Sequence, residues 1–155
     1  MLQQSEHRPY GELDDRLHDA HALTAELFRD VIDETCSRLR SIRLTESAAR
    51  IERLIKSDAW TDAVLALIEI ELPQWRIRRL AYDEGEWHCA LSQARELPEW
   101  LDQSIEACHA DLPLAILSAF VAARQVTAPL DKTSVPTVRR ERTQLYEPVC
   151  CDNFA

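Results

Sequence analysis

The sequence predicts a mainly helical α+β domain of about five helices with one inserted β-hairpin. The stretch from Glu12 to Leu72 contains no glycine or proline, which favours helices. Residues 75–92 instead join two runs of β-type residues through a short turn that contains Gly85. With 46% hydrophobic and 29% charged residues, the 155-residue chain can form one compact core. We therefore expect a single domain over residues 12–125.

The two ends of the chain lack the pattern of a packed element. We expect residues 1–11 to form a flexible N-terminus. Residues 126–155 hold three prolines, an arginine cluster and no hydrophobic periodicity. Such a segment buries too little apolar surface to order its backbone, so we predict a disordered tail.

The first predicted helix is the longest. Apolar side chains recur at spacings of three and four from Leu13 and Leu17 to Leu27, Val31 and Ile42. This periodicity predicts one amphipathic helix over residues 12–42, about 45 Å long.

Capping residues divide the rest of the glycine-free stretch. Thr45 can begin a helix over residues 46–56, and Ser57 with Asp58 can begin another over residues 58–72. The run from 63 to 68 (AVLALI) is apolar on every side, so we expect the latter helix to be buried.

The hairpin comes next, and its register can be argued from the apolar residues. A three-residue loop pairs Tyr82 with Glu86, and it places most apolar residues on one face. That face would comprise Trp75, Ile77, Ala81, Trp87, Cys89 and Leu91. Two further helices, over residues 98–108 and 112–125, are predicted to complete the domain, with Asp111 as the cap of the last.

Composition excludes several classes of function. The two glycines, Gly11 and Gly85, cannot form a Walker A loop or a dinucleotide-binding G-x-G-x-x-G turn, and G-x-S-x-G is absent. A net charge of −9 disfavours nucleic-acid binding. No apolar run approaches the ~20 residues of a membrane span, and no signal-peptide core is visible. Five cysteines, an odd number, indicate reduced thiols and a cytoplasmic protein. Since no cofactor motif is present, we expect no cofactor.

Four residues are weak candidates for metal ligands. His18 and His21 are three residues apart on the first predicted helix, and Cys89 and Cys108 each neighbour a histidine. Adjacent residues rarely bind one ion, and buried cysteine commonly acts as a small apolar group. We therefore predict no metal site and no catalytic residue.

Two surfaces are candidates for binding a partner. Arg76 and Arg78 share a predicted strand face with Tyr82, and guanidinium groups there can bind oxyanions or an acidic helix. Pairing with acidic residues of the same chain is the alternative. Leu27 and Val31 lie on the apolar stripe of the first helix, which is wide enough to predict a homodimer.

Three segments carry a resemblance to known proteins: LALIEIELPQW at 65–75, YDEGEW at 82–87 and DLPLAILSAF at 111–120. Together they resemble an uncharacterised family of small alphaproteobacterial proteins over roughly residues 45–125. The resemblance implies a bacterial cytosolic origin and carries no activity, ligand or catalytic residue.

The sequence leaves three hypotheses for function. The leading one is a non-catalytic interaction or regulatory protein that binds an unknown protein partner through residues 12–42 and the hairpin. A sensor that binds a small ligand or a metal through its histidine and cysteine groups is the alternative. An enzyme of unknown class is the third, since no nucleophile–base pair or carboxylate constellation is visible.

Overall fold

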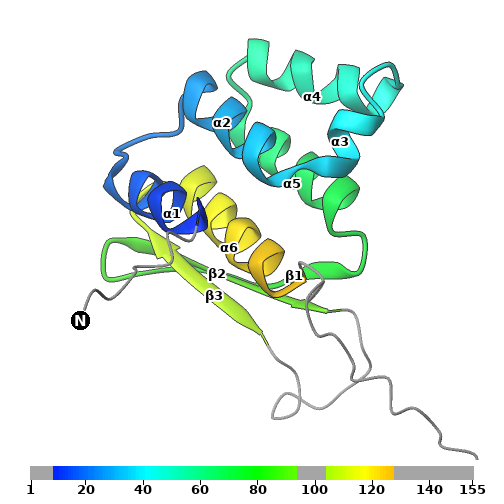
Figure 1. Ribbon diagram of the computed structural model, residues 1–155. Coiled ribbons are helices and arrows are strands. Elements are labelled where there is room, and N and C mark those ends of the chain that lie inside the picture. Colours follow the sequence, from blue (N-terminus) through cyan, green and yellow to red (C-terminus); the bar gives the residue numbers. More distant parts are fainter. Residues whose placement is uncertain (1–8, 94–103, 128–155) are drawn as a thin grey trace, which may run out of the picture.

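The computed structural model describes residues 9–93 and 104–127, which form six helices and one three-stranded antiparallel sheet (Figure 1). The predicted α+β class is therefore confirmed, although the described ranges hold six helices rather than about five. The helices are α1 (Pro9–Asp19), α2 (Ala25–Thr35), α3 (Ser37–Ser41), α4 (Glu46–Lys56), α5 (Trp60–Glu71) and α6 (Leu112–Thr127). The strands, in the order β1-β2-β3, are β1 (Trp75–Asp83), β2 (Glu86–Gln93) and β3 (Ile105–His109).

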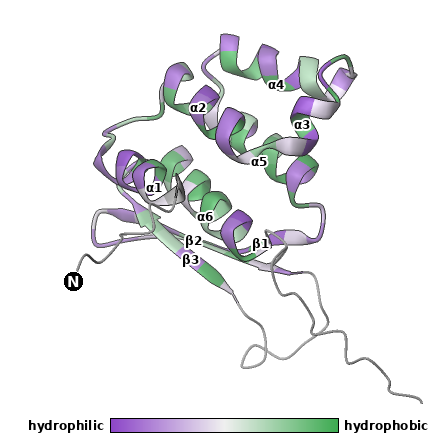
Figure 2. Cartoon of the chain, viewed as in Figure 1, coloured by the Kyte–Doolittle hydropathy of each residue, from purple (hydrophilic) through white to green (hydrophobic). Residues whose placement is uncertain are grey.

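Helices cover one face of the sheet. Helices α1 and α6 lie directly over the strands, and α2 to α5 form a further group beyond them (Figure 1). Helix α6 is central to the core, because its Leu117, Phe120 and Val121 are fully buried. Figure 2 shows that α6 is hydrophobic along most of its length, as expected for a helix packed on several sides.

The prediction of one long helix over residues 12–42 is wrong. The chain folds there into α1, α2 and the five-residue α3. The Thr24 hydroxyl begins α2 by accepting a hydrogen bond from the Leu27 N–H at 3.3 Å. A single helix of about 45 Å would extend beyond the core, whereas three shorter helices pack the same apolar residues against it. The buried residues of this segment include Leu13, Leu17, Leu27, Phe28, Val31 and Leu39.

The next two helices agree with their predictions. Helix α4 covers residues 46–56 as expected, and α5 covers most of the predicted 58–72. Helix α5 begins two residues late because Asp58 adopts a positive φ of 55° in the turn after α4. The segment 63–68 is buried except for Leu65, which is partly buried, as its apolar composition predicts.

The hairpin is present, but its predicted three-residue loop is wrong. Asp83 pairs with Glu86, so the loop has two residues, Glu84 and Gly85, with φ of 49° and 94°. Two positive φ values in succession are typical of a type I′ turn.

A β-bulge at Arg78 reconciles this shorter loop with an apolar face. Ile77 pairs with Leu91 and Arg79 with Ala90, which leaves Arg78 as the extra residue. Beyond the bulge the alternation is reversed, so Leu80 and Tyr82 replace the predicted Ala81 on the face of Cys89 and Trp87. The residues on the opposite face include Arg76, Arg79, Ala81, His88 and Ala90.

The predicted helix over residues 98–108 is wrong at its C-terminal end. Ile105–His109 form β3, antiparallel to β2, and residues 98–103 lie outside the described part of the chain. The short run alternates between the two faces, and pairing satisfies the second edge of β2. The last helix is confirmed, and the Asp111 carbonyl accepts the first-turn hydrogen bond from Ala115 at 3.0 Å; the Oδ2 atom of Asp111, the predicted cap, has no hydrogen-bond partner in the described part of the chain.

The domain ends differ slightly from their predictions. Helix α1 begins at Pro9, within the segment predicted to be flexible, since proline suits the first turn of a helix. Helix α6 continues to Thr127, and the rest of the predicted tail lies outside the described residues. Within the described ranges, no helix is both long and apolar enough to cross a bilayer.

Candidate functional site: an arginine-lined cleft

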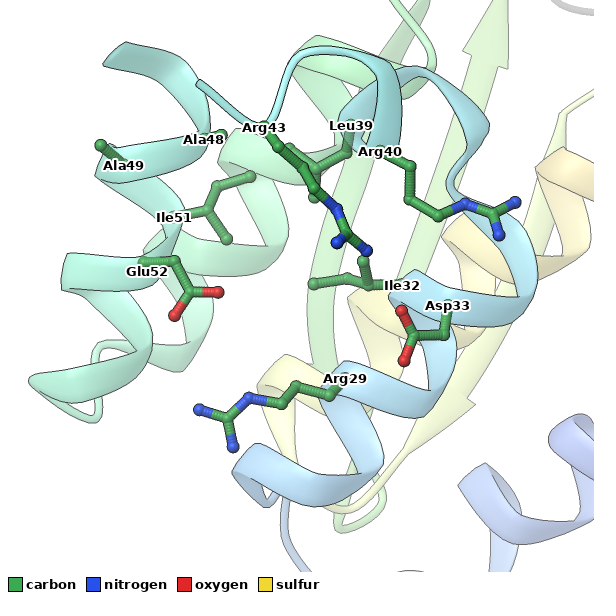
Figure 3. A pocket seen from close by; sticks show the side chains of 10 residues that line it. All are labelled: Arg29, Ile32, Asp33, Leu39, Arg40, Arg43, Ala48, Ala49, Ile51 and Glu52. Carbon is green, nitrogen blue, oxygen red and sulfur yellow. The ribbon is translucent and has the colours of Figure 1, made fainter. Parts of the chain in front are cut away.

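A cleft of about 400 Å³ opens between α2, α3 and α4 (Figure 3). Its size lies within the range of ~300–1,000 Å³ typical of ligand-binding pockets. Helix α2 forms one wall, α4 forms the other, and α3 with the turn that follows it closes one end. We refer to it as the arginine cleft.

The floor of the arginine cleft is apolar. Leu39, Ala48 and Ile51 are buried, and Ile32 is half-buried beside them. Ile51 belongs to the face of α4 that packs on α5, so the floor is continuous with the core of the helical layer. A ligand with an apolar group can therefore bury it here without displacing a packed side chain.

The rim of the cleft is rich in arginine. Arg29, Arg40 and Arg43 line it, against the two carboxylates of Asp33 and Glu52, and all five are exposed. Figure 3 shows Arg29 reaching from α2 toward α4 and Arg43 extending into the space between them. Within the described ranges, neither of these two guanidinium groups forms an ion pair. They can therefore bind an anionic group of a ligand in bidentate geometry.

An exposed leucine directly follows a residue of the cleft lining in sequence. Leu44 lies in the turn between α3 and α4, next to Arg43, and its side chain is fully exposed. Only three other large hydrophobic residues of the described ranges are exposed: Leu80, Tyr82 and Val126. Leu44 is thus an exposed apolar side chain outside the cleft lining, in the turn that forms its closed end.

A buried ion pair holds α3, which forms the closed end of the cleft. Cys36 precedes α3 and gives it no side-chain cap, and the Glu71 carboxylate of α5 instead accepts the Leu39 N–H at 2.6 Å. The Arg124 guanidinium of α6 donates two hydrogen bonds to the Thr35 carbonyl at the end of α2, at 3.0 and 2.7 Å. Glu71 and Arg124 lie 3.7 Å apart.

These contacts satisfy backbone groups that the break between α2 and α3 would otherwise leave unpaired. Glu71 is fully buried at its side chain, and its Oε2 atom has no hydrogen-bond partner in the described part of the chain. The carboxylate therefore depends on the Arg124 charge for compensation. The pair fixes the position of Leu39 and Arg40 in the cleft wall, where the Arg40 Nε also donates to the Cys36 carbonyl at 3.2 Å.

Two of the thiols are buried and protonated at neutral pH. Burial raises the pKa of Cys36 to about 12, with the nearby Glu71 charge adding to the shift. Burial alone raises the pKa of Cys89 to about 11. Since the thiolate is the nucleophile and the metal ligand, neither residue is activated for either role.

The structure separates the four candidate metal ligands. Cys89 pairs with Ala107 and faces the helices, whereas Cys108 pairs with His88 on the other face of the sheet, so the two thiols cannot share one ion. His18 is in α1 and His21 is in the loop that follows it. Over residues 9–93 and 104–127, no group of three or more His, Cys, Asp or Glu side chains could hold a metal.

Of the candidate partner-binding residues, the two on α2 are buried and the three on β1 are exposed. Leu27 and Val31 are buried in the core of the protomer, so they cannot form the predicted seam between two copies. Arg76, Arg78 and Tyr82 are exposed on β1. Tyr82 lies on the helix-facing side of the sheet, where its ring is 5.1 Å from that of Trp87, and not on the face of Arg76.

The alternative of internal pairing for the strand arginines does not involve the glutamates of α5. Glu69 lies 3.9 Å from Arg50, and Glu71 is held by Arg124. The arginine cleft itself was not predicted from the sequence. Arg29 and Arg43 come together only because the chain breaks after α2, whereas the Thr24 cap signals only the break before that helix.

No family model, curated protein or solved structure matches this chain. The resemblance to small bacterial proteins therefore stays a prediction.

Proposed function

We propose that this protein is a non-catalytic binding module whose arginine cleft takes a segment of a partner protein. The segment combines at least one apolar side chain with acidic residues. The observation that carries the proposal is the combination of an apolar floor with the guanidinium groups of Arg29 and Arg43, which form no ion pair within the described ranges. The proposal keeps the leading hypothesis from the sequence and moves the contact from a helix stripe to the cleft.

Charge and apolar contact act together in this proposal. Burial of one leucine or phenylalanine side chain on the cleft floor contributes roughly 1.5–3 kcal/mol. Carboxylates of the partner then pair with Arg29 and Arg43 at the rim, where the protein surface screens them from solvent on one side. The protein carries a net charge of −9, so these arginines set the cleft rim apart from the overall acidic charge of the chain.

A partner segment suits the site better than a small molecule because apolar surface continues outside the cleft. The fully exposed Leu44 directly follows Arg43 of the lining in sequence, and a ligand confined to 400 Å³ would leave the leucine side chain exposed to solvent. The walls are helices without a free strand edge, so the site favours a helix laid in a groove over an added strand.

Selection from random peptides tests the proposal for a partner of any sequence. A displayed library is selected on the full chain, and the dissociation constants of the enriched peptides are measured by fluorescence anisotropy. The variant Ala49→Trp fills the cleft from an exposed position on α4. We expect it to weaken binding at least tenfold, about 1.4 kcal/mol.

The matched control is Ser47→Trp, which places the same side chain at an exposed position of α4 outside the cleft lining. It should leave the affinity unchanged within a factor of two or so. Failure to enrich any peptide, or equal binding by both variants and the wild type, would contradict the proposed function.

A further inference from the structure

The tip of the hairpin carries the two kinds of group that the arginine cleft is proposed to bind, carboxylates and an exposed apolar side chain. We define the hairpin tip as residues 82–86, all of which are exposed. It carries three carboxylates, Asp83, Glu84 and Glu86, around the two-residue turn. Tyr82, one of the four exposed large hydrophobic residues of the described ranges, is 60% exposed on the face of the hairpin opposite Asp83 and Glu86.

The hairpin tip is also rigid in form. The turn pairs Asp83 with Glu86, and the Tyr82 ring packs on Trp87 with centroids 5.1 Å apart. A preorganised segment loses less conformational entropy on binding than a mobile one. Its like charges face each other across the strands and repel, so a cationic partner would relieve an existing unfavourable contact.

The tip cannot reach the cleft of its own chain. Figure 1 shows the β1–β2 turn at the lower left, beneath α1, and α4 along the top of the molecule. The sheet is separated from α2, α3 and α4 by the layer of α1 and α6. Any contact between the two surfaces must therefore join two copies.

We infer that the arginine cleft of one copy binds the hairpin tip of a second copy. Tyr82 enters over the apolar floor from one face of the hairpin, and the carboxylates in the turn and on its other face pair with Arg29 and Arg43 at the rim. The two surfaces differ, so the contact is head-to-tail, and each added copy leaves one cleft and one tip open. The inference rests on the proposed binding role of the cleft and adds that self-association competes with a partner segment.

Charge reversal with restoration is the test. One variant, Arg29→Glu with Arg43→Glu, reverses the cleft, and another, Asp83→Lys with Glu86→Lys, reverses the tip. Sedimentation velocity of the full chain is measured from about 10 to about 500 µM, a range suited to weak contacts. The wild type should show a mass that rises with concentration at about 50 mM NaCl and less so at about 500 mM, where exposed charges are screened.

Each reversed variant alone should stay monomeric over that range, because its cleft and its tip carry the same sign. An equimolar mixture should associate again, since each cleft then meets a tip of opposite sign. The control Arg38→Glu with Arg50→Glu changes the same charge at exposed positions outside the cleft lining and should associate as the wild type does. Circular dichroism verifies that every variant is folded.

Three results would overturn the inference: a monomeric wild type at low salt, association that survives reversal of the tip, or a mixture that fails to associate. If the reversed cleft impairs folding, Ala49→Trp blocks the same cleft without a charge change and must abolish association as well. Peptide binding by a chain that never self-associates would retain the proposed function and refute this inference alone.

Discussion

Substitution of Glu71 by glutamine should destabilise the fold through loss of charge alone. Glutamine retains an oxygen that can accept the Leu39 N–H, which Glu71 binds at 2.6 Å. It cannot neutralise Arg124, whose guanidinium lies 3.7 Å away and is 19% exposed at its side chain. The change therefore isolates the electrostatic part of the contact that holds α3.

The expected cost follows from the burial of the pair. Removal of one partner of a buried ion pair typically costs about 3–5 kcal/mol, because the other charge stays buried without compensation. Arg124 keeps its two hydrogen bonds to Thr35 and some contact with solvent, so we expect the lower end, about 3 kcal/mol. In a domain of this size, that corresponds to a fall in Tm of roughly 6–12 °C.

Urea unfolding monitored by circular dichroism measures this loss. The matched control is Glu69→Gln on the same helix, where the carboxylate is 72% exposed and 3.9 Å from Arg50. Exposed pairs of this kind contribute little, so the control should change the free energy of unfolding by less than about 0.5 kcal/mol. A Glu71→Gln effect as small as that of the control would refute the account of the α2–α3 break.

Three further predictions concern the thiols, the turn and the cleft rim. The folded-state pKa values of Cys36 and Cys89, about 12 and about 11, exceed the usual 9.0, so the unfolded chain loses these protons first. Below pH 9 these thiols should not affect the free energy of unfolding. Above pH 9 the free energy of unfolding should fall by up to about 1.4 kcal/mol per pH unit for each thiol. Replacement of both cysteines by alanine should reduce this fall. In the turn, Glu84→Asn should raise the free energy of unfolding by about 0.5–1 kcal/mol, whereas Gly85→Ala should lower it by about 1 kcal/mol. The two differ because only Gly85→Ala adds a Cβ at a φ of 94°. Equal effects of the two substitutions in urea unfolding would exclude the type I′ turn. Leu44→Ser should leave Tm within about 2 °C of the wild type and weaken binding of the selected peptides severalfold, whereas a large fall in Tm would show that Leu44 is packed.

Local patterns were sufficient to predict the elements that lie close together in sequence. Helix α4 was predicted at its observed bounds from Thr45 and Glu46, although the Thr45 hydroxyl donates to the Ile42 carbonyl and makes no side-chain cap, and α6 was predicted from its continuous apolar run. The hairpin was predicted from two β-type runs around Gly85. In each case the residues that determine the element are inside it or next to it.

Contacts between distant residues explain what the sequence did not predict. The end of α2 and the start of α3 are stabilised by Arg124 and Glu71, which lie 89 and 32 residues away from their partners. The bulge at Arg78 shifts the alternation of β1 by one residue, which compensates for the shorter loop. Several residues predicted for the apolar face therefore lie on it, although the predicted loop length is wrong. Strand β3 shows no strand pattern longer than five residues and depends on the edge of β2.

The candidate site was missed for the same reason. Arg29 and Arg40 look like the polar side of one long helix over residues 12–42, and Arg43 follows its predicted end. Breaks in the chain turn α3 and α4 back beside α2, and only then do these arginines surround an apolar floor. The residues proposed from the sequence, Leu27 and Val31, became part of the core through the same folding of the chain.

The central claim is that the arginine cleft binds an acidic segment that carries an apolar side chain. The most direct measurement is a titration of the ¹⁵N-labelled full chain with a selected peptide, followed by amide chemical shifts. We expect the largest shifts at Arg29, Arg43, Leu44 and Ala49, and none of comparable size on β3 or on the part of β1 that precedes the hairpin tip. Shifts concentrated on the sheet, with the amides of α2 and α4 unchanged, would contradict the account.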